Sequence, residues 1–182
     1  FSIDYKLRLV YTMRVKRLIV SAALLTIAAV AVAEIFAPQI AMPMALALLI
    51  LPIVMLTANL VNKPLEAAIS RWYYNDAKRI LRSMPQLTII GVTGSFGKTS
   101  TKHYLYRILS EKYNVLMTPG NFNTTLGVIR TVREHLKPHH QIFIVEMGAK
   151  QVGDIKEICD LVHPTIGIVT AVGEMHLETF HT

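Results

Sequence analysis

The sequence is short of cysteine and of charge. Cys159 is the only cysteine among 182 residues, so the chain cannot build a disulfide framework or a cysteine-rich zinc site, and we expect a reducing compartment. Charged residues make up 17% of the chain, and residues 18–62 contain Glu34 but no lysine or arginine. A segment this poor in charge is unsuited to a fully solvated surface.

Two apolar runs fill the charge-poor segment. They cover residues 18–37 and 40–61, and each has about the twenty residues that a membrane-spanning helix requires. We predict a transmembrane helical hairpin over residues 18–61, with a tight turn at Pro38-Gln39 on the outer side. A buried hairpin of a soluble protein is the alternative, and a signal peptide is a second alternative for the first run.

Basic residues flank the two runs. Residues 1–17 carry five basic residues and one acidic residue, and residues 63–85 carry five basic and two acidic residues. Residues 86–182 are nearly balanced, with nine basic and eight acidic residues. Cations gathered beside apolar runs favour a membrane topology with both flanks in the cytoplasm, and they argue against a nucleic-acid surface. The sequence therefore predicts a lipid bilayer as a partner and no nucleic acid.

The chain divides into four segments on this basis. We expect a basic juxtamembrane segment at residues 1–17, two transmembrane helices at 18–61 and an amphipathic linker helix at 62–85, with Pro64 in the first turn of that helix. Residues 86–182 form an α/β domain that looks short for a finished enzyme. We expect both ends of the chain to be cut from a longer protein.

Strands and helices alternate in the last segment, which predicts an α/β fold with a parallel sheet. Ligands of such sheets lie beyond the carboxyl ends of the strands. Strands are predicted at residues 87–93, 114–117, 141–146 and 165–170, and helices at 98–111, 125–136 and 154–162.

A glycine-spaced turn follows the first of these strands. Gly94 and Gly97 allow a tight turn with inward N–H groups, and the helix that begins near Lys98 adds its positive end, so the turn is suited to phosphate. Lys98 would reach the phosphates and the Thr99 hydroxyl would ligate Mg²⁺. The usual P-loop spacing is missing, because Val92 stands where its first glycine would be. The alternative is an ordinary strand-to-helix turn with a surface lysine.

Polar residues also follow the other strands. The second strand leads into a loop with Asn121, Asn123 and Thr124, the third ends at Glu146, and the fourth is followed by His176. A carboxylate and an imidazole at adjacent strand ends are suited to hold a divalent cation together with Thr99. The five histidines at positions 103, 135, 139, 140 and 163 are interpreted as structural or solvated.

These motifs, in this order, resemble those of the Mur ligases, the ATP-dependent enzymes that join amino acids or peptides to cell-wall precursors. The resemblance rests on T-G-S-x-G-K-T-S-T at 93–101, E-M-G-A at 146–149 and G-x-x-H-L-E at 173–178. The segment G-N-x-N-x-x-x-G at 120–127 resembles the MurF type. The fold implied is part of the P-loop NTPase-like central domain.

The resemblance also implies the cofactors and the roles of residues. It implies ATP and Mg²⁺, and amide formation through an acyl phosphate between a cell-wall precursor and the amine of an amino acid or dipeptide. A carbamylated lysine and a closing C-terminal domain would lie further along the chain. The implied residues are Lys98, Glu146 and His176 for catalysis, Thr99, Glu146 and His176 for metal, Asn121, Asn123 and Thr124 for substrate, and Thr93, Gly94, Ser95, Gly97, Lys98, Thr99 and Ser100 for nucleotide.

Together with the predicted hairpin, the resemblance to the Mur ligases predicts a membrane-anchored variant of that family in the bacterial cytoplasmic membrane, with its catalytic domain in the cytoplasm. Other function classes stay open. A membrane-anchored P-loop ATPase or kinase would share the phosphate turn but would release phosphate without an amine acceptor. A non-catalytic scaffold for wall-synthesis partners would bind nucleotide, if at all, without turnover. Within the ligases, an amidating relative is a further alternative.

Overall fold

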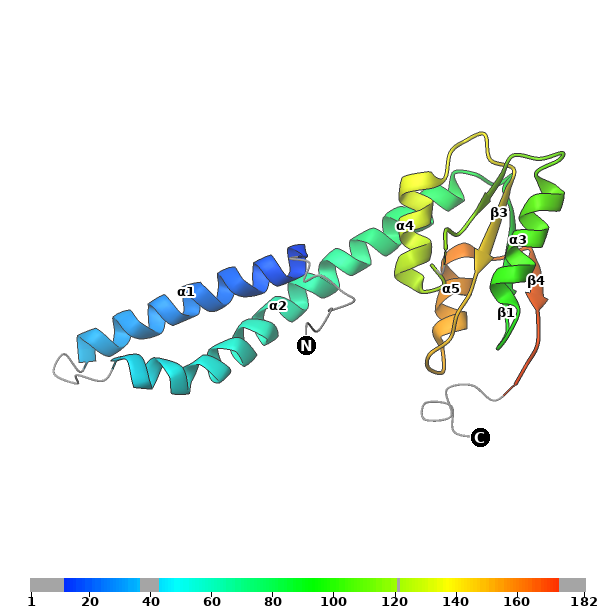
Figure 1. Ribbon diagram of the computed structural model, residues 1–182. Coiled ribbons are helices and arrows are strands. Elements are labelled where there is room, and N and C mark those ends of the chain that lie inside the picture. Colours follow the sequence, from blue (N-terminus) through cyan, green and yellow to red (C-terminus); the bar gives the residue numbers. More distant parts are fainter. Residues whose placement is uncertain (1–11, 37–42, 121, 174–182) are drawn as a thin grey trace, which may run out of the picture. The chain divides into compact units, whose positions relative to one another are not determined.

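The computed structural model describes residues 12–36, 43–120 and 122–173, and it divides into two compact units that meet at Ser70 and Arg71. Of the side chains in the helices, those at 29–30, 33–36 and 43–52 are not described. The first unit contains helix α1 (Met13–Phe36) and most of helix α2 (Pro43–Arg82), and α2 continues into the second unit (Figure 1).

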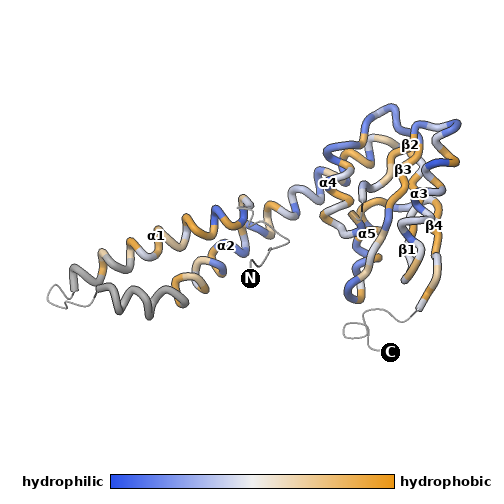
Figure 2. The backbone as a smooth tube through the Cα atoms, in the orientation of Figure 1, coloured by the Kyte–Doolittle hydropathy of each residue, from blue (hydrophilic) through white to orange (hydrophobic). Residues whose placement is uncertain are grey.

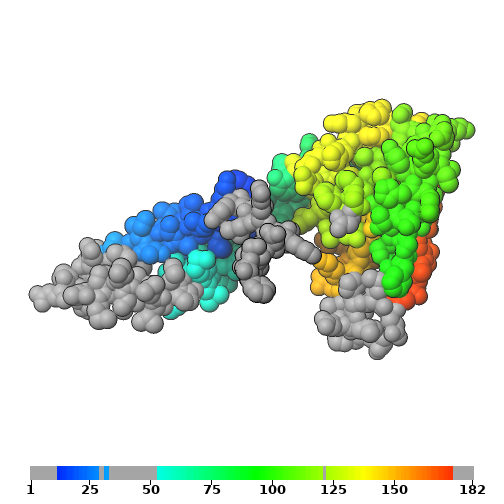
Figure 3. Space-filling view, viewed as in Figure 1, coloured from blue at the N-terminus to red at the C-terminus, as the bar shows by residue number. Residues whose placement is uncertain are grey.

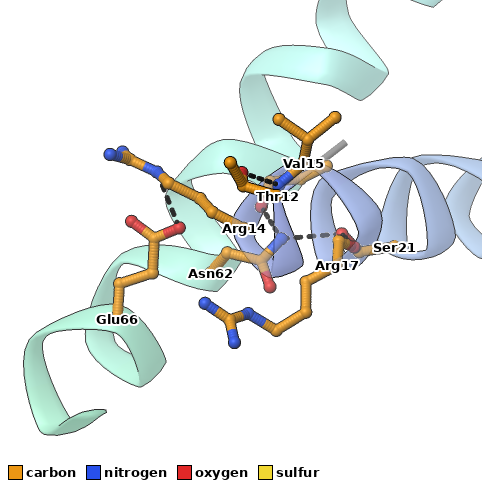
Figure 4. A network of polar contacts seen from close by, with 8 residues as sticks. Thr12, Arg14, Val15, Arg17, Ser21, Asn62 and Glu66 are labelled. Atoms are coloured by element: carbon orange, nitrogen blue, oxygen red, sulfur yellow. Dashed lines mark hydrogen bonds and ion pairs between the residues drawn. The ribbon is translucent and has the colours of Figure 1, made fainter. Parts of the chain in front are cut away.

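Small side chains and a polar contact join α1 and α2 within the first unit. Ala22, Val54 and Ala58 are buried against one another, as expected where two helices approach closely. Nearby, Asn62 Nδ2 donates to Ser21 Oγ at 2.7 Å and to the Ala58 carbonyl oxygen at 2.9 Å (Figure 4). These contacts fix how the two helices pack along the described part of the hairpin.

The predicted membrane crossing is not confirmed by the structure. Within the described ranges, we find no helix that combines the length and the apolar character needed to cross a membrane. The predicted turn at Pro38-Gln39 and residues 1–11 of the predicted juxtamembrane segment lie outside the described residues.

The predicted start of a linker helix at Pro64 is wrong, because Pro64 lies inside α2. A proline within a helix removes one backbone hydrogen bond and bends the helix without having to end it. The best N-cap candidate before it, Asn62, uses its side chain amide on Ser21 and on its own helix. The sequence therefore lacks an effective stop and start signal at this point.

A four-stranded parallel sheet forms the centre of the second unit, as the sequence predicts. Its strands lie in the order β2-β3-β1-β4, so the chain first winds to one side of β1 and then crosses to the other. The strands are β1 (Thr88–Thr93), β2 (Val115–Met117), β3 (Ile142–Glu146) and β4 (Ile166–Val169), and the helices are α3 (Lys98–Leu109), α4 (Thr125–His135) and α5 (Asp154–Val162). Each differs from its predicted range by at most two residues at either end.

Alternate residues of β1 and β3 feed two cores, one on each face of the sheet. Ile90 and Ile144 face α3, whereas Ile89 and Phe143 face α4 and α5 (Figure 1). A strand covered on both faces is apolar throughout, and all five residues of β3 are buried. The outer face of α3 lies at the surface of the unit (Figure 3). The sheet thus has its two central strands fully covered and their carboxyl ends available for a site.

The last turns of α2 pack on this domain. Ala77 and Leu81 are buried in the core that α4 and α5 share. The Arg133 guanidinium of α4 lies over the rings of Tyr73 and Trp72, at 4.2 and 5.0 Å from their centroids, and its Nε is 2.8 Å from Asp76 Oδ2. The end of α2 therefore docks on protein through both apolar and charged contacts.

Candidate nucleotide and metal site

The turn between β1 and α3 has the backbone that its glycines predict. Gly94 and Gly97 have φ values of +137° and +81°, a region that other residues avoid. Gly97 is the N-cap of α3 and provides no side-chain cap, so the first N–H groups of the helix have no side-chain acceptor there. Backbone N–H groups left open at a helix N-terminus attract phosphate.

The segment after β4 braces this turn. Thr170 Oγ1 donates to the carbonyl oxygen of Phe96 at 2.6 Å, and Ser95 N donates to the Ala171 carbonyl oxygen at 2.6 Å. The Thr93 carbonyl oxygen accepts from the Thr170 amide at 2.8 Å. The turn is therefore held from the side opposite β3 by hydrogen bonds within the protein.

Lys98 and Ser100 lie in the first turn of α3, as predicted. Lys98 Nζ donates to the carbonyl oxygens of Gly94 and Ser95 at 2.6 and 3.2 Å. The ammonium therefore lies over the turn where it is expected to contact phosphate. Ser100 is exposed in the first helical turn. A cation that satisfies the turn's carbonyls is placed to exchange those contacts for phosphate oxygens.

Thr99 and Glu146 meet where the turn faces the end of β3. Thr99 Oγ1 donates to Glu146 Oε1 at 3.1 Å. Glu146 is 1% exposed, and its Oε2 forms an ion pair with Lys102 Nζ at 2.8 Å, which leaves further lone pairs on both oxygens. A hydroxyl beside a buried carboxylate with spare lone pairs fits the oxygen ligands that Mg²⁺ prefers. These two residues would hold the metal ion.

His176, the third predicted metal ligand, lies outside the described residues. Within the part of the chain that the structure describes, no group of three or more His, Cys, Asp or Glu side chains is gathered as a metal site. Thr99 and Glu146 are in contact, whereas metal binding by Thr99, Glu146 and His176 stays a prediction.

The loop after β2 reaches the same edge of the sheet. Asn123 lies beside Glu146, with Nδ2 at 3.5 Å from Oε1, and its carbonyl oxygen accepts from the Gly148 amide at 2.7 Å. Thr124 is the N-cap of α4, where its Oγ1 accepts from the Gly127 amide. Asn121 lies outside the described residues. The structure thus brings Asn123 to the metal site and gives Thr124 a helix-capping role, while their contacts with substrate stay predictions.

Two residues at the site were not singled out in the sequence. Lys102 of α3 is fully buried, and its Nζ lies 2.8 Å from Glu146 Oε2 and 2.6 Å from the Gly120 carbonyl oxygen. Thr118 is also fully buried, and its Oγ1 accepts from the Glu146 amide at 3.1 Å. Helical spacing gives a signal for Lys102, because residues three apart, such as Thr99 and Lys102, share a helix face.

The five histidines interpreted as structural or solvated fit that interpretation in the structure. Those at positions 103, 135, 139 and 163 are exposed. His140 is half-buried beside His139, with ring centroids 4.4 Å apart, and burial together with that neighbour lowers the pKa of its imidazole. Its Nδ1 accepts from the Lys137 amide at 2.9 Å, which makes it a turn residue.

Comparison with known proteins places this site in a family. The model of the Mur ligase middle domain matches residues 92–182. A UDP-N-acetylmuramoyl-tripeptide–D-alanyl-D-alanine ligase from Synechocystis is 45% identical over 91 residues, which are 50% of this chain and 20% of that protein. The ligase of that name from Escherichia coli is 32% identical over 130 residues, 68% of this chain and 28% of that protein.

Solved structures agree with the sequence relatives. MurF from Acinetobacter baumannii superimposes with a TM-score of 0.58 at 34% identity, covering 60% of this chain and 24% of that one. MurF from Thermotoga maritima in complex with ADP gives a TM-score of 0.56 at 36% identity, covering 59% of this chain and 25% of that one. The chain thus spans about a quarter of the length of the relatives that it matches. With its phosphate turn, its strand-end glutamate and its parallel sheet, the chain belongs to the Mur ligase family.

Proposed function

We propose that the protein acts as an ATP-dependent ligase of the MurF type, which joins D-alanyl-D-alanine to a UDP-N-acetylmuramoyl tripeptide. The observation that supports this most is the contact between Thr99 and Glu146 beside an uncapped helix N-terminus. It gathers phosphate-binding N–H groups and metal-binding oxygens in one place. The similarity to named MurF ligases supplies the substrate class.

The proposed reaction has two steps. A carboxylate oxygen of the tripeptide attacks the γ-phosphorus of ATP, the bond to the β,γ-bridging oxygen breaks, and an acyl phosphate and ADP form. The amine of D-alanyl-D-alanine then attacks the acyl carbon, phosphate leaves, and the nitrogen loses a proton as the amide forms. Positioning and charge neutralisation are the main contributions of an enzyme to the first step.

The residues of this chain would share that work. The amides at the start of α3 and the ammonium of Lys98 would bind the phosphates and stabilise their negative charge. Thr99 and Glu146 would hold Mg²⁺, which when bound neutralises phosphate charge. Asn123 is placed beside Glu146 to face a substrate that enters over the same edge. His176 is proposed as a further metal ligand.

Phosphate release in the intact protein tests this proposal. We expect release to require ATP, Mg²⁺, the UDP-linked tripeptide and D-alanyl-D-alanine together, and Lys98→Ala to abolish it. Lys112→Ala is the matched control, since Lys112 is exposed and lies over the Tyr113 ring. Release that proceeds without the dipeptide would favour an ATPase or kinase. Nucleotide binding without release would favour the non-catalytic scaffold, and unchanged turnover in Lys98→Ala would refute the site assignment.

We further propose that the first unit anchors the protein in the bacterial cytoplasmic membrane, with the second unit on the ATP side. Large apolar side chains of α1 and α2 are exposed instead of packed. Figure 2 shows hydrophobic residues along the described parts of both helices. The small residues Ala22 and Ala58 join the two helices, so the large ones are left for another environment. Acyl chains match this chemistry, and the cations around the apolar runs match anionic headgroups. Between residues 18 and 61, the large apolar residues described as exposed are Ile19, Val20, Leu24, Ile27, Val32, Ile53, Met55, Leu56, Leu60 and Val61.

Extraction of isolated membranes tests the anchor. We expect the protein to stay in the membrane pellet at alkaline pH and to be released by detergent, whereas a variant without residues 18–61 should be soluble. Release of the intact protein by alkali would refute the anchor. If the anchor holds, a lipid-linked precursor should be used better than its soluble nucleotide-linked form. Equal or better activity on the soluble form would contradict that preference.

A further inference from the structure

Lys102 is a buried cation with two partners from different parts of the fold. Its side chain is 0% exposed, and an ammonium removed from water requires close anionic or dipolar partners. Its Nζ lies 2.8 Å from Glu146 Oε2, at the end of β3, and 2.6 Å from the Gly120 carbonyl oxygen, in the loop after β2. One side chain of α3 therefore joins the metal-ligand strand to the loop that carries Asn123.

The two oxygens of Glu146 contact two different side chains of α3. Oε1 accepts from Thr99 Oγ1 at 3.1 Å, and Oε2 faces the Lys102 ammonium. These contacts fix the orientation of the carboxylate with Oε1 toward the phosphate turn. Groups that orient a metal ligand from behind strongly affect metal affinity.

The Gly120 contact holds the middle of the loop. Gly120 has a φ of +50°, and the turn around it closes with the Phe122 amide donating to the Pro119 carbonyl oxygen at 3.0 Å. Farther on, Asn123 is held by the Gly148 amide and reaches Glu146. The loop therefore reaches Glu146 in two ways. Asn123 lies beside it directly, and Gly120 is linked to it through the Lys102 ammonium.

From this geometry we propose that Lys102 is a positioning residue with two roles. It fixes Glu146 as a metal ligand, and it couples that ligand to the described parts of the substrate-side loop, residues 118–120 and 122–124. Lys102 is distinct from Lys98, whose Nζ donates to the carbonyl oxygens of Gly94 and Ser95 in the phosphate turn. The inference rests on the proposed nucleotide and metal binding.

Titration of ADP binding against Mg²⁺ in the intact protein tests the first role. In Lys102→Met, which keeps the length of the side chain, we expect the Mg²⁺ concentration for half-maximal ADP binding to rise about 10- to 100-fold. Lys112→Met, at an exposed site, should leave it unchanged. If wild type binds ADP with Mg²⁺ and Lys102→Met matches it, the inference fails. If wild type binds no ADP at all, the proposed function fails instead.

Hydrogen exchange of the Phe122 amide tests the second role. In Glu146→Gln, Lys102 still contacts the Gly120 carbonyl oxygen and so still holds the loop. We therefore expect the Phe122 amide to exchange more slowly in this variant than in the double variant Lys102→Met/Glu146→Gln, which lacks that contact. The double variant has no buried charge at this point, so the comparison holds even if Lys102→Met alone does not fold. A cation that only neutralises Glu146 would give equal exchange rates in these two variants, and that result would overturn the coupling.

Discussion

Thr99 donates a hydrogen bond to Glu146 across 3.1 Å, although 47 residues separate them in the sequence. One comes from the first turn of α3 and the other from the end of β3, two elements that meet because β1 and β3 are neighbours in the sheet. The contact brings the uncapped helix start and a buried carboxylate together. It is therefore the point at which the fold most directly supports metal-dependent nucleotide binding.

Replacing Thr99 should separate metal-dependent from metal-independent binding. In Thr99→Val we expect ADP binding in Mg²⁺ to weaken at least about tenfold, since even groups that only hydrogen-bond to the ligands of a metal have effects of that size. Thr99→Ser keeps the hydroxyl and should stay near wild type. Calorimetric titration of ADP in Mg²⁺ and in EDTA checks this. An equal loss in both conditions would mean that the hydroxyl contacts phosphate and not metal.

Gly94 should tolerate no side chain. A Cβ at this position would lie 2.1 Å from Thr170 Oγ1, and the φ of +137° is unfavourable for any other residue. Gly153, with a φ of +102° and open space around it, provides a control in which only backbone strain is added. We expect Gly153→Ala to cost about 1–3 kcal/mol of unfolding free energy and Gly94→Ala to cost more.

Urea unfolding of both alanine variants measures this difference. Gly94→Ala should also weaken ADP binding, because relief of the clash requires the phosphate turn to move away from Thr170. Similar unfolding free energies for the two variants would indicate that the segment after β4, which contains Thr170, moves at little energetic cost to accommodate the added Cβ. In that case the bracing of the turn by Thr170 would be weaker than its hydrogen bonds suggest.

Acid should weaken the docking of α2 on α4. The hydrogen bond from Arg133, followed by that from Arg79, lowers the pKa of the Asp76 carboxyl below its usual range. A carboxyl with a lower pKa in the folded state stabilises the fold above its unfolded pKa, and that contribution is lost as pH falls through the folded value. The loss should therefore occur below about pH 4.

Unfolding at pH 7 and at pH 3 in wild type and in Asp76→Asn checks this expectation. Wild type should lose more stability between the two pH values than the variant, since the variant has no carboxyl to protonate at this position. Asp154 and Asp160 also have lowered pKa values, but they are present in both proteins and cancel in the comparison. An equal loss in both proteins would show that Arg133 is held by Trp72 and Tyr73 alone.

The sequence predicted the elements of the sheet well because each has a strong local signal. β3 has five consecutive apolar or strand-ending residues, and the helices have apolar faces at helical spacing. The phosphate turn could also be predicted, because φ values such as that of Gly97 leave glycine almost without competitors. Local chemistry sufficed at these positions.

The partners of the site were harder to predict. A lysine in a helix usually faces water, and Lys102 is buried only because β3 and the loop at Gly120 close over it. Contacts of that kind depend on which segments meet in three dimensions, and sequence spacing indicates only that Lys102 shares a face with Thr99. Pro64 shows the opposite limit, since a residue type that suits the first turn of a helix lies here in the interior of a long one.

Thr118 supports the site through the backbone of its metal ligand. Its Oγ1 is the acceptor for the Glu146 amide at 3.1 Å, in a fully buried position. Thr118→Val preserves the shape but leaves that N–H without its partner, which should cost about 1–3 kcal/mol of unfolding free energy. Thr131→Val is the matched control, because Thr131 is equally buried but only donates to Gly127 of its own helix. Urea unfolding should rank Thr118→Val as the more destabilised variant. Equal costs for the two variants would mean that the Glu146 amide finds another acceptor and that Thr118 does not position the metal ligand.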